Sequence, residues 1–174
     1  MLYNIRGANG SGKSTLVRSY IAPHSIQVPL ADSIGYLDER LGIVVVGKYT
    51  TDCGGCDTIK TQAGVKAAVM AALELAPTVM FEGVLVSTIF GPWLEFSRSV
   101  GGMVWCYLDT PVEMCLQRIY HRNGGKAINE KLVHDKITSI ATTQRKAVEA
   151  GEMVAVLDYL NAKAQLDATF ALLE

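Results

Sequence analysis

The amino-acid sequence predicts an α/β protein built as a three-layer sandwich, with helices on both faces of a parallel five-stranded core sheet. Three observations support this fold class. Short apolar runs of strand length alternate with segments of helical periodicity along the chain. The 174 residues, 49% of them hydrophobic, suffice for one domain with a substantial core. A glycine-rich phosphate-binding signature also follows the first apolar run, at residues 7–14.

The signature reads GANGSGKS and fits the pattern G-x-x-x-x-G-K-S/T, which is typical of a P-loop NTPase. Its glycines let the backbone close around an oxyanion, so that N–H groups and the next helix N-terminus converge on phosphate oxygens. We expect Lys13 to reach the β- and γ-phosphates and Ser14 to bind Mg²⁺. The sequence therefore predicts ATP and Mg²⁺ as cofactors. The expected nucleotide-binding residues here are Gly7, Asn9, Gly10, Ser11, Gly12, Lys13, Ser14 and Thr15.

The other elements follow in order along the chain. Strands are expected at 2–6, 25–30, 78–81, 103–108 and 153–157, with an inserted β-hairpin at 34–37 and 43–47. The first helix is expected after residue 14 and stops at Pro23, and the second ends at about 76. Further helices are expected at 91–100, 110–122, 129–150 and 161–173. Thr110 to Glu113 form a predicted capping box, with Pro111 at the first helical position. Because no linker or repeat interrupts this order, we expect a single P-loop kinase domain over 1–174 with a lid at about 118–130.

Composition and charge exclude several classes of protein. Sixteen Lys and Arg residues against seventeen Asp and Glu give a net charge of −1, which is unlike a generic nucleic-acid-binding protein, although a local basic groove remains compatible with it. The apolar runs are too short for a signal peptide or a membrane span, so we expect a cytoplasmic protein. Cys53 and Cys56 form a C-x-x-C pair, which is either a zinc or redox site or a pair of small loop residues.

Three carboxylates are candidates for the chemistry of a phosphoryl transfer. Glu82 follows the apolar strand 78–81, where it can hold a Mg²⁺-bound water or accept the proton of an attacking hydroxyl. Asp57 lies in the glycine-rich loop 48–58 and is either such a base or the N-cap of a helix that begins at Thr58. Asp32 is either a base or a solvated turn residue. Three aromatic residues follow Glu82: Phe90, Trp93 and Phe96. They either form a surface on which a substrate base stacks or belong to the hydrophobic core.

An arginine pair on the predicted helix 110–122 separates a kinase from other P-loop proteins. Arg118 and Arg122 are four residues apart and precede a glycine break, which resembles the lid helix of nucleoside monophosphate kinases. That resemblance implies one arginine on adenine and the next on phosphate, with Arg145 as a third cation. The alternative for each is a solvated helix face. No N-K-x-D stretch is present, which argues against a GTPase.

Four stretches resemble a family of small bacteriophage P-loop kinases: 4–14, 47–49, 54–59 and 81–87. Members phosphorylate, with ATP, the hydroxymethyl oxygen of 5-hydroxymethyluracil already present in DNA, as a step of thymine hypermodification. The resemblance therefore implies DNA containing a modified base as the partner and the host-cell cytoplasm as the location. The expected catalytic residues are Lys13, Asp57, Glu82 and Arg122, and the expected metal ligands are Ser14 and Glu82.

Two other functions remain open at this point. One is a kinase of free nucleosides or nucleotides, and the other is a nucleotide-binding ATPase module in which water is the acceptor. A DNA kinase predicts an open groove and a basic cluster beside the glycine-rich loop, for which Lys48, Lys60 and Arg98 are candidates.

Overall fold

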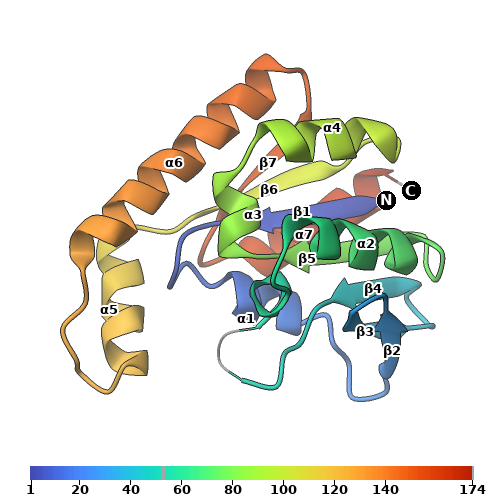
Figure 1. Ribbon diagram of the computed structural model, residues 1–174, viewed down its shortest axis with the longest axis horizontal. Helices are drawn as coiled ribbons and strands as arrows, with labels where there is room; N and C mark the ends of the chain where they lie inside the picture. The colour runs from blue at the N-terminus through green and yellow to red at the C-terminus, as the bar shows by residue number, and fades with distance from the viewer. Residues whose placement is uncertain (52–53, 174) are drawn as a thin grey trace.

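The computed structural model describes residues 1–51 and 54–173, and it forms one seven-stranded sheet with helices on both faces (Figure 1). The strands are β1 (Leu2–Arg6), β2 (Ile26–Leu30), β3 (Ser33–Asp38), β4 (Ile43–Val46), β5 (Thr78–Glu82), β6 (Val104–Asp109) and β7 (Met153–Asp158). The helices are α1 (Lys13–Arg18), α2 (Gln62–Leu73), α3 (Val84–Thr88), α4 (Gly91–Ser99), α5 (Val112–Arg122), α6 (Glu130–Glu149) and α7 (Ala162–Leu173), with the 3-10 turn η1 (Cys56–Thr58).

The sheet has the order β2-β3-β4-β5-β1-β6-β7, and its last five strands are parallel. β4 belongs to both parts of the sheet, because it pairs antiparallel with β3 and parallel with β5. The expected β-hairpin is confirmed as β3 and β4, and Asp38 closes its turn by accepting the backbone N–H groups of Arg40 and Leu41. A five-stranded parallel core is therefore confirmed, but its membership differs from the expectation: β4 of the hairpin belongs to it, whereas the expected core strand 25–30 is β2, an antiparallel edge strand.

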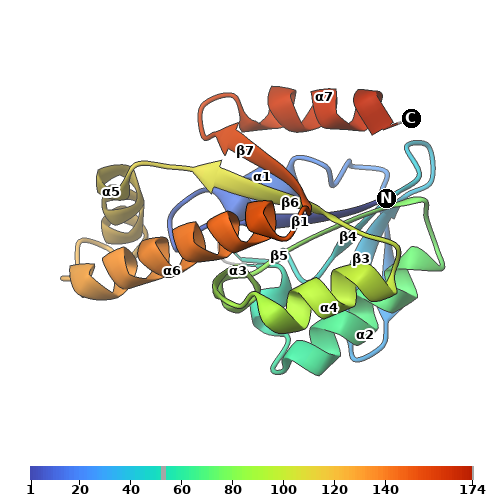
Figure 2. The same cartoon turned by 90° about the horizontal axis from the view of Figure 1, so that it is seen from above.

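Helices cover the sheet in two layers, which separate clearly when the molecule is seen from above (Figure 2). On one face, α1 and α7 pack Val17 and Leu166 against Ile5 of β1. On the other face, α2, α4 and α6 pack against the opposite side of the same strands. Trp93 is fully buried there, 5.3 Å from the Phe81 ring centroid, and this cluster also takes in Phe90 and Phe96. The three aromatic residues are thus core residues and no stacking surface.

The carboxyl ends of the parallel strands place the functional loops along one edge of the sheet. The P-loop follows β1, the glycine-rich loop follows β4, Glu82 ends β5, and α5 with α6 projects from the same edge, on the left of Figure 1. This arrangement brings residues that are far apart in sequence to one site. Among the described helices, none is both long and apolar enough to span a bilayer.

Two local expectations are wrong. The capping box is absent, because Pro111 is the N-cap of α5 and no side chain caps this helix; Thr110 Oγ1 instead donates to the Ser11 carbonyl of the P-loop at 2.9 Å. Asp57 is not the N-cap of a helix that begins at Thr58, because α2 begins at Gln62 and its N-cap is Thr61. The short helix α3 was not expected from the sequence, since five residues are too few to show a helical period.

Candidate active site

The P-loop joins β1 to α1 in the conformation that phosphate binding needs. Gly10 and Gly12 have positive φ values of 76° and 100°, and a Cβ on Gly10 would overlap the Cys115 carbonyl oxygen. Lys13 is buried, and its Nζ donates to the Ala8 carbonyl at 3.0 Å. Burial lowers the pKa of Lys13, against the raising effect of the Glu82 charge. Lys13 is therefore held inside the loop, where an arriving phosphate would satisfy its charge.

Ser14 and Glu82 meet at the floor of this site. The Ser14 hydroxyl donates to Glu82 Oε1 at 2.8 Å, and Glu82 is fully buried. Burial raises the pKa of Glu82 to about 7, although the Lys13 charge and the Ser14 hydrogen bond act in the opposite direction. Glu82 Oε2 has no hydrogen-bond partner among the described residues. A hydroxyl beside a carboxylate with a free oxygen is a donor set that suits Mg²⁺.

The glycine-rich loop covers Glu82 because two glycines pack against each other. Gly47 and Gly55 have positive φ values of 107° and 72°, and a Cβ on Gly47 would overlap the Gly55 backbone. The Gly55 N–H donates to the Lys48 carbonyl at 2.8 Å, which closes the loop at its base. A Cβ on Gly55 would overlap Glu82 Oε1. Glycine at 55 is therefore required for the loop to shield the carboxylate from solvent.

Asp57 lies on the other side of this loop and is exposed. Its Oδ1 accepts the backbone N–H of Val84 at 2.8 Å, so it caps the first turn of α3 across the site. The same helix contacts the P-loop, since Ser87 Oγ accepts the Gly7 N–H at 3.2 Å and donates to the Gly83 carbonyl at 2.6 Å. The missed helix α3 therefore connects Asp57 to the phosphate-binding loop.

One cavity of about 420 Å³ joins these parts. It is lined by Asn9, Gly10, Gly12, Lys13, Ser14, Thr15, Arg18, Gly54, Asp57, Val84, Arg118 and Arg122. Four of these residues carry positive charge and Asp57 alone is acidic, whereas the whole chain has a net charge of −1. Glu82 lies beneath the wall and does not line the cavity. The cavity is thus a local cationic site, as binding of a polyphosphate requires.

The expected arginine pair reaches this cavity from α5. Arg118 Nη1 donates to the carbonyls of Gly10 and Ser11 at 3.2 and 3.1 Å, and its guanidinium carbon lies 5.5 Å from the Tyr159 ring centroid. Arg122 lines the cavity one turn further along the helix. A second cavity of about 370 Å³ lies between Arg118, Tyr159 and the start of α1. The structure therefore brings both arginines to the P-loop side of the site.

Arg145, the expected third cation, does not line the cavity. That residue is exposed on α6 and pairs with Glu149 at 3.8 Å, one turn away on the same helix. Lys136, nine residues earlier on α6, instead donates to Asn9 Oδ1 at 3.2 Å and lowers the pKa of Lys13 further. The sequence analysis missed Lys136, because no local pattern signals a contact between residues 127 positions apart.

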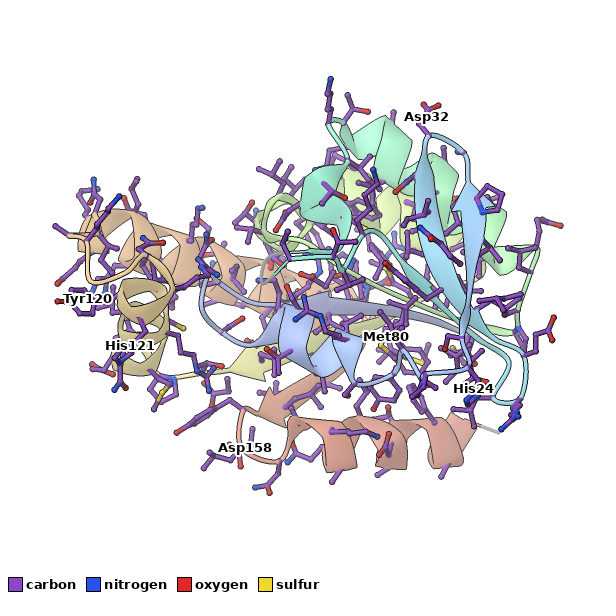
Figure 3. All side chains as sticks on the ribbon, turned by 90° about the horizontal axis from the view of Figure 1, so that it is seen from below. His24, Asp32, Met80, Tyr120, His121 and Asp158 are labelled. Atoms are coloured by element: carbon purple, nitrogen blue, oxygen red, sulfur yellow. The ribbon has the colours of Figure 1, made fainter. Side chains whose placement is uncertain are left out.

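Other candidates lie away from the cavity. Asp32 is at the exposed turn between β2 and β3, on the opposite side of the molecule from Tyr120 and His121 of α5 (Figure 3). Arg98 bonds to Glu152 and to the Ala150 carbonyl at the other end of the sheet, so it is no part of a basic cluster at the loop. Lys48 and Lys60 are exposed near that loop.

The C-x-x-C pair is described only in part. Cys56 is a free, buried thiol, while Cys53 lies outside the described residues. Within residues 1–51 and 54–173 there is no group of three or more His, Cys, Asp or Glu side chains that could hold a metal ion.

Comparison with known proteins decides the family. A family model described as "5-hmdU DNA kinase" matches residues 1–156. The chain belongs to this family. A 5-hmdU DNA kinase of Pseudomonas phage M6 is 44% identical over 170 residues, with 87% of each chain covered. A 5-hmdU DNA kinase of Pseudomonas phage PaMx11 is 30% identical over 168 residues, with 89% of each chain covered.

A third relative, 5-hmdU DNA kinase 1 of Salmonella phage ViI, is 35% identical over 144 residues, which is 78% of this chain and 65% of the relative. The resemblance noted from the four sequence stretches is therefore confirmed, and the chain is a phosphotransferase of the 5-hmdU DNA kinase family.

Proposed function

We propose that this protein transfers the γ-phosphoryl group of ATP to the hydroxymethyl oxygen of 5-hydroxymethyluracil in DNA. The observation that carries the proposal is that the P-loop and Asp57 line the same cavity, from different walls. Phosphoryl transfer needs donor and acceptor to be aligned in one space. The target base must leave the duplex to enter that space. Because its relatives are phage proteins, we infer that it acts in the host-cell cytoplasm.

The donor half would bind ATP through the P-loop backbone and Lys13. Arg118 and Arg122 belong to the lid that we place at about 118–130, and the cavity between Arg118 and Tyr159 suits the adenine ring. Ser14 would bind Mg²⁺, and Glu82, which accepts the Ser14 hydroxyl, would hold a water bound to the ion; the ion would compensate phosphate charge during transfer. Thr15 lines the cavity beside them. This assignment gives Glu82 the metal role among its two alternatives.

The acceptor half would use Asp57 as the general base. Glu82 is buried behind Gly55 and does not face the cavity, whereas Asp57 lines it. Because Oδ1 is held by the Val84 N–H, Oδ2 is the oxygen available to a substrate. The hydroxymethyl oxygen attacks the γ-phosphorus, the bond to the β-phosphate oxygen breaks, and the hydroxyl proton passes to Asp57. The products are ADP and a phosphorylated base.

The proposal is tested with γ-labelled ATP and Mg²⁺ offered with plain DNA, DNA containing 5-hydroxymethyluracil, or free nucleosides and nucleotides. We expect label only in the modified DNA, and Lys13→Ala is expected to abolish it through loss of charge at the transferred phosphoryl group. Label confined to free nucleotides would overturn the DNA substrate. Label released only as inorganic phosphate would overturn the kinase function and favour an ATPase.

A further inference from the structure

One cation in the cavity comes from neither the P-loop nor the lid. Arg18 is the last residue of α1, four residues after Ser14 and on the same face of the helix. Its guanidinium donates to the Thr51 carbonyl in the glycine-rich loop and lies 5.9 Å from the Tyr49 ring centroid. Arg18 therefore lies at the acceptor end, whereas Arg118 and Arg122 approach from α5.

The charge of Arg18 is uncompensated in the described part of the chain. No described carboxylate forms an ion pair with it, although surface arginines elsewhere in the chain, such as Arg98, do have one. Its Nε is buried and has no hydrogen-bond partner among the described residues. A donor that is buried without a partner costs free energy, so its presence beside a substrate cavity indicates a ligand acceptor.

The helix geometry limits which part of a substrate Arg18 can meet. Four residues of α-helix advance by about 6 Å, so the start of the Arg18 side chain lies close to the Ser14 hydroxyl. The attacking oxygen must come within about 3–3.5 Å of the γ-phosphorus. In the target base the hydroxymethyl group is on C5 and the O4 carbonyl is on the adjacent ring carbon. The sugar is attached at N1, across the ring from C4, which keeps the DNA backbone on the far side.

We propose that Arg18 donates a hydrogen bond to O4 of the target base and thereby selects 5-hydroxymethyluracil over 5-hydroxymethylcytosine. This inference rests on the proposed function. A guanidinium has five N–H donors and no acceptor, so it complements a carbonyl. Cytosine presents an amino group at C4, which is also a donor. Arg18 and that amino group would face each other as two donors, and neither would be satisfied.

The test uses two duplexes that are identical except for one base, 5-hydroxymethyluracil or 5-hydroxymethylcytosine. We expect wild-type protein to phosphorylate the uracil duplex about 10- to 100-fold faster, the range that one good base contact supplies. Arg18→Gln is expected to bring the ratio of the two rates toward one, because its amide oxygen accepts from the cytosine amino group. Arg18→Lys keeps a donor without an acceptor and is expected to keep the preference for uracil.

Arg40→Gln is the matched control, because Arg40 lies in the exposed turn between β3 and β4 and should leave both rates unchanged. Equal wild-type rates on both duplexes would overturn the inference and leave the proposed function intact. Equal losses on both duplexes with Arg18→Gln would also overturn it, and would assign Arg18 to a backbone phosphate. A protein that labels neither duplex would overturn the proposed function and this inference together.

Discussion

The two halves of the candidate site are built in different ways. The donor half is a local structure, in which eight consecutive residues and one helix N-terminus hold a buried lysine. The acceptor half takes Arg18 from α1, Gly54 and Asp57 from the loop after β4, and Val84 from α3. The donor ligand is a phosphate chain that is common to all P-loop kinases, whereas the acceptor is particular to a family. A shared ligand can thus be bound by one compact segment, and a particular one requires side chains from several elements.

The largest effect on this comparison is expected from Asp57→Asn in the acceptor half. Asparagine can still accept the Val84 N–H, so the fold of α3 should survive, but it cannot take the hydroxyl proton. We expect kcat on modified DNA to fall about 10³-fold with nucleotide affinity unchanged. Steady-state kinetics and nucleotide titration measure the two quantities.

Asp32→Asn is the control for that substitution, because Asp32 is exposed at the β2–β3 turn and outside the cavity. Its kinetics should equal those of the wild type. If Asp57→Asn keeps full turnover, Asp57 is only a cap for α3 and the base must be sought elsewhere.

A smaller effect is expected from Lys136→Met, which tests whether the donor half extends beyond the P-loop. Lys136 reaches Asn9 from α6. From there its ammonium group can donate to the γ-phosphoryl oxygens and stabilise the negative charge that develops during transfer. We expect a decrease of about 10²-fold in kcat with little change in KM for DNA. Lys136→Arg should restore part of the rate.

Lys131→Met is the matched control on the same helix. Lys131 is exposed and pairs with Asp135 at 2.6 Å, away from the P-loop. A loss of the same size in both variants would mean that α6 contributes only general positive charge, and the donor half would then end at the P-loop and the arginines of α5.

The smallest effect concerns the pH dependence that Glu82 gives to the free energy of unfolding in the absence of Mg²⁺. The pKa of Glu82 is raised from 4.5 to about 7 in the fold, chiefly by burial. The folded state therefore holds this proton more tightly than the unfolded chain, so the stabilisation is complete below pH 4.5 and is lost as the pH rises through 7.

We expect Glu82→Gln to remove this pH dependence. Relative to the variant, the wild type should lose roughly 1–3 kcal/mol in its free energy of unfolding between pH 5 and pH 8. Denaturant titrations with EDTA measure the difference, and Glu39→Gln at an exposed position provides a variant with no such trend. If the free energies of unfolding of the wild type and Glu82→Gln change with pH in parallel, burial does not raise the pKa of Glu82. The buried carboxylate would then not distinguish the donor half from the acceptor half electrostatically.

The sequence predicted the donor half because its signals are local. The spacing of Gly7, Gly12 and Lys13 identifies the loop without any knowledge of the fold, and the apolar run before Glu82 places that carboxylate at a strand end. The strands and the hairpin were predicted for the same reason, since alternation and turn residues act over a few positions, but the pairing of β4 with β5 and the edge position of β2 depend on tertiary contacts.

The remaining features depend on tertiary contacts that no short pattern records. Arg145 was the cation expected from α6, because both Arg145 and Lys136 are basic residues of one helix and the sequence does not show which of them faces the P-loop. In the structure Lys136 donates to Asn9, whereas Arg145 is exposed and pairs with Glu149. Thr110 fitted a capping box, yet its hydroxyl bonds to the P-loop, which offered a carbonyl from 99 positions away. For Asp57 the N-cap alternative named a helix beginning at Thr58, whereas the N–H that it accepts is on α3.

The bond between Lys48 and Gly55 has a consequence for how such kinases can be altered. Because these two residues are joined at the base of the loop, the chain leaves the sheet and returns to it at one point. The free-energy cost of closing a loop grows only slowly with its length, so a change in length beyond the buried Tyr49 is expected to leave the sheet intact. The same bond also fixes Gly55 beside Glu82, so the buried carboxylate is covered by backbone that is anchored at the end of β4.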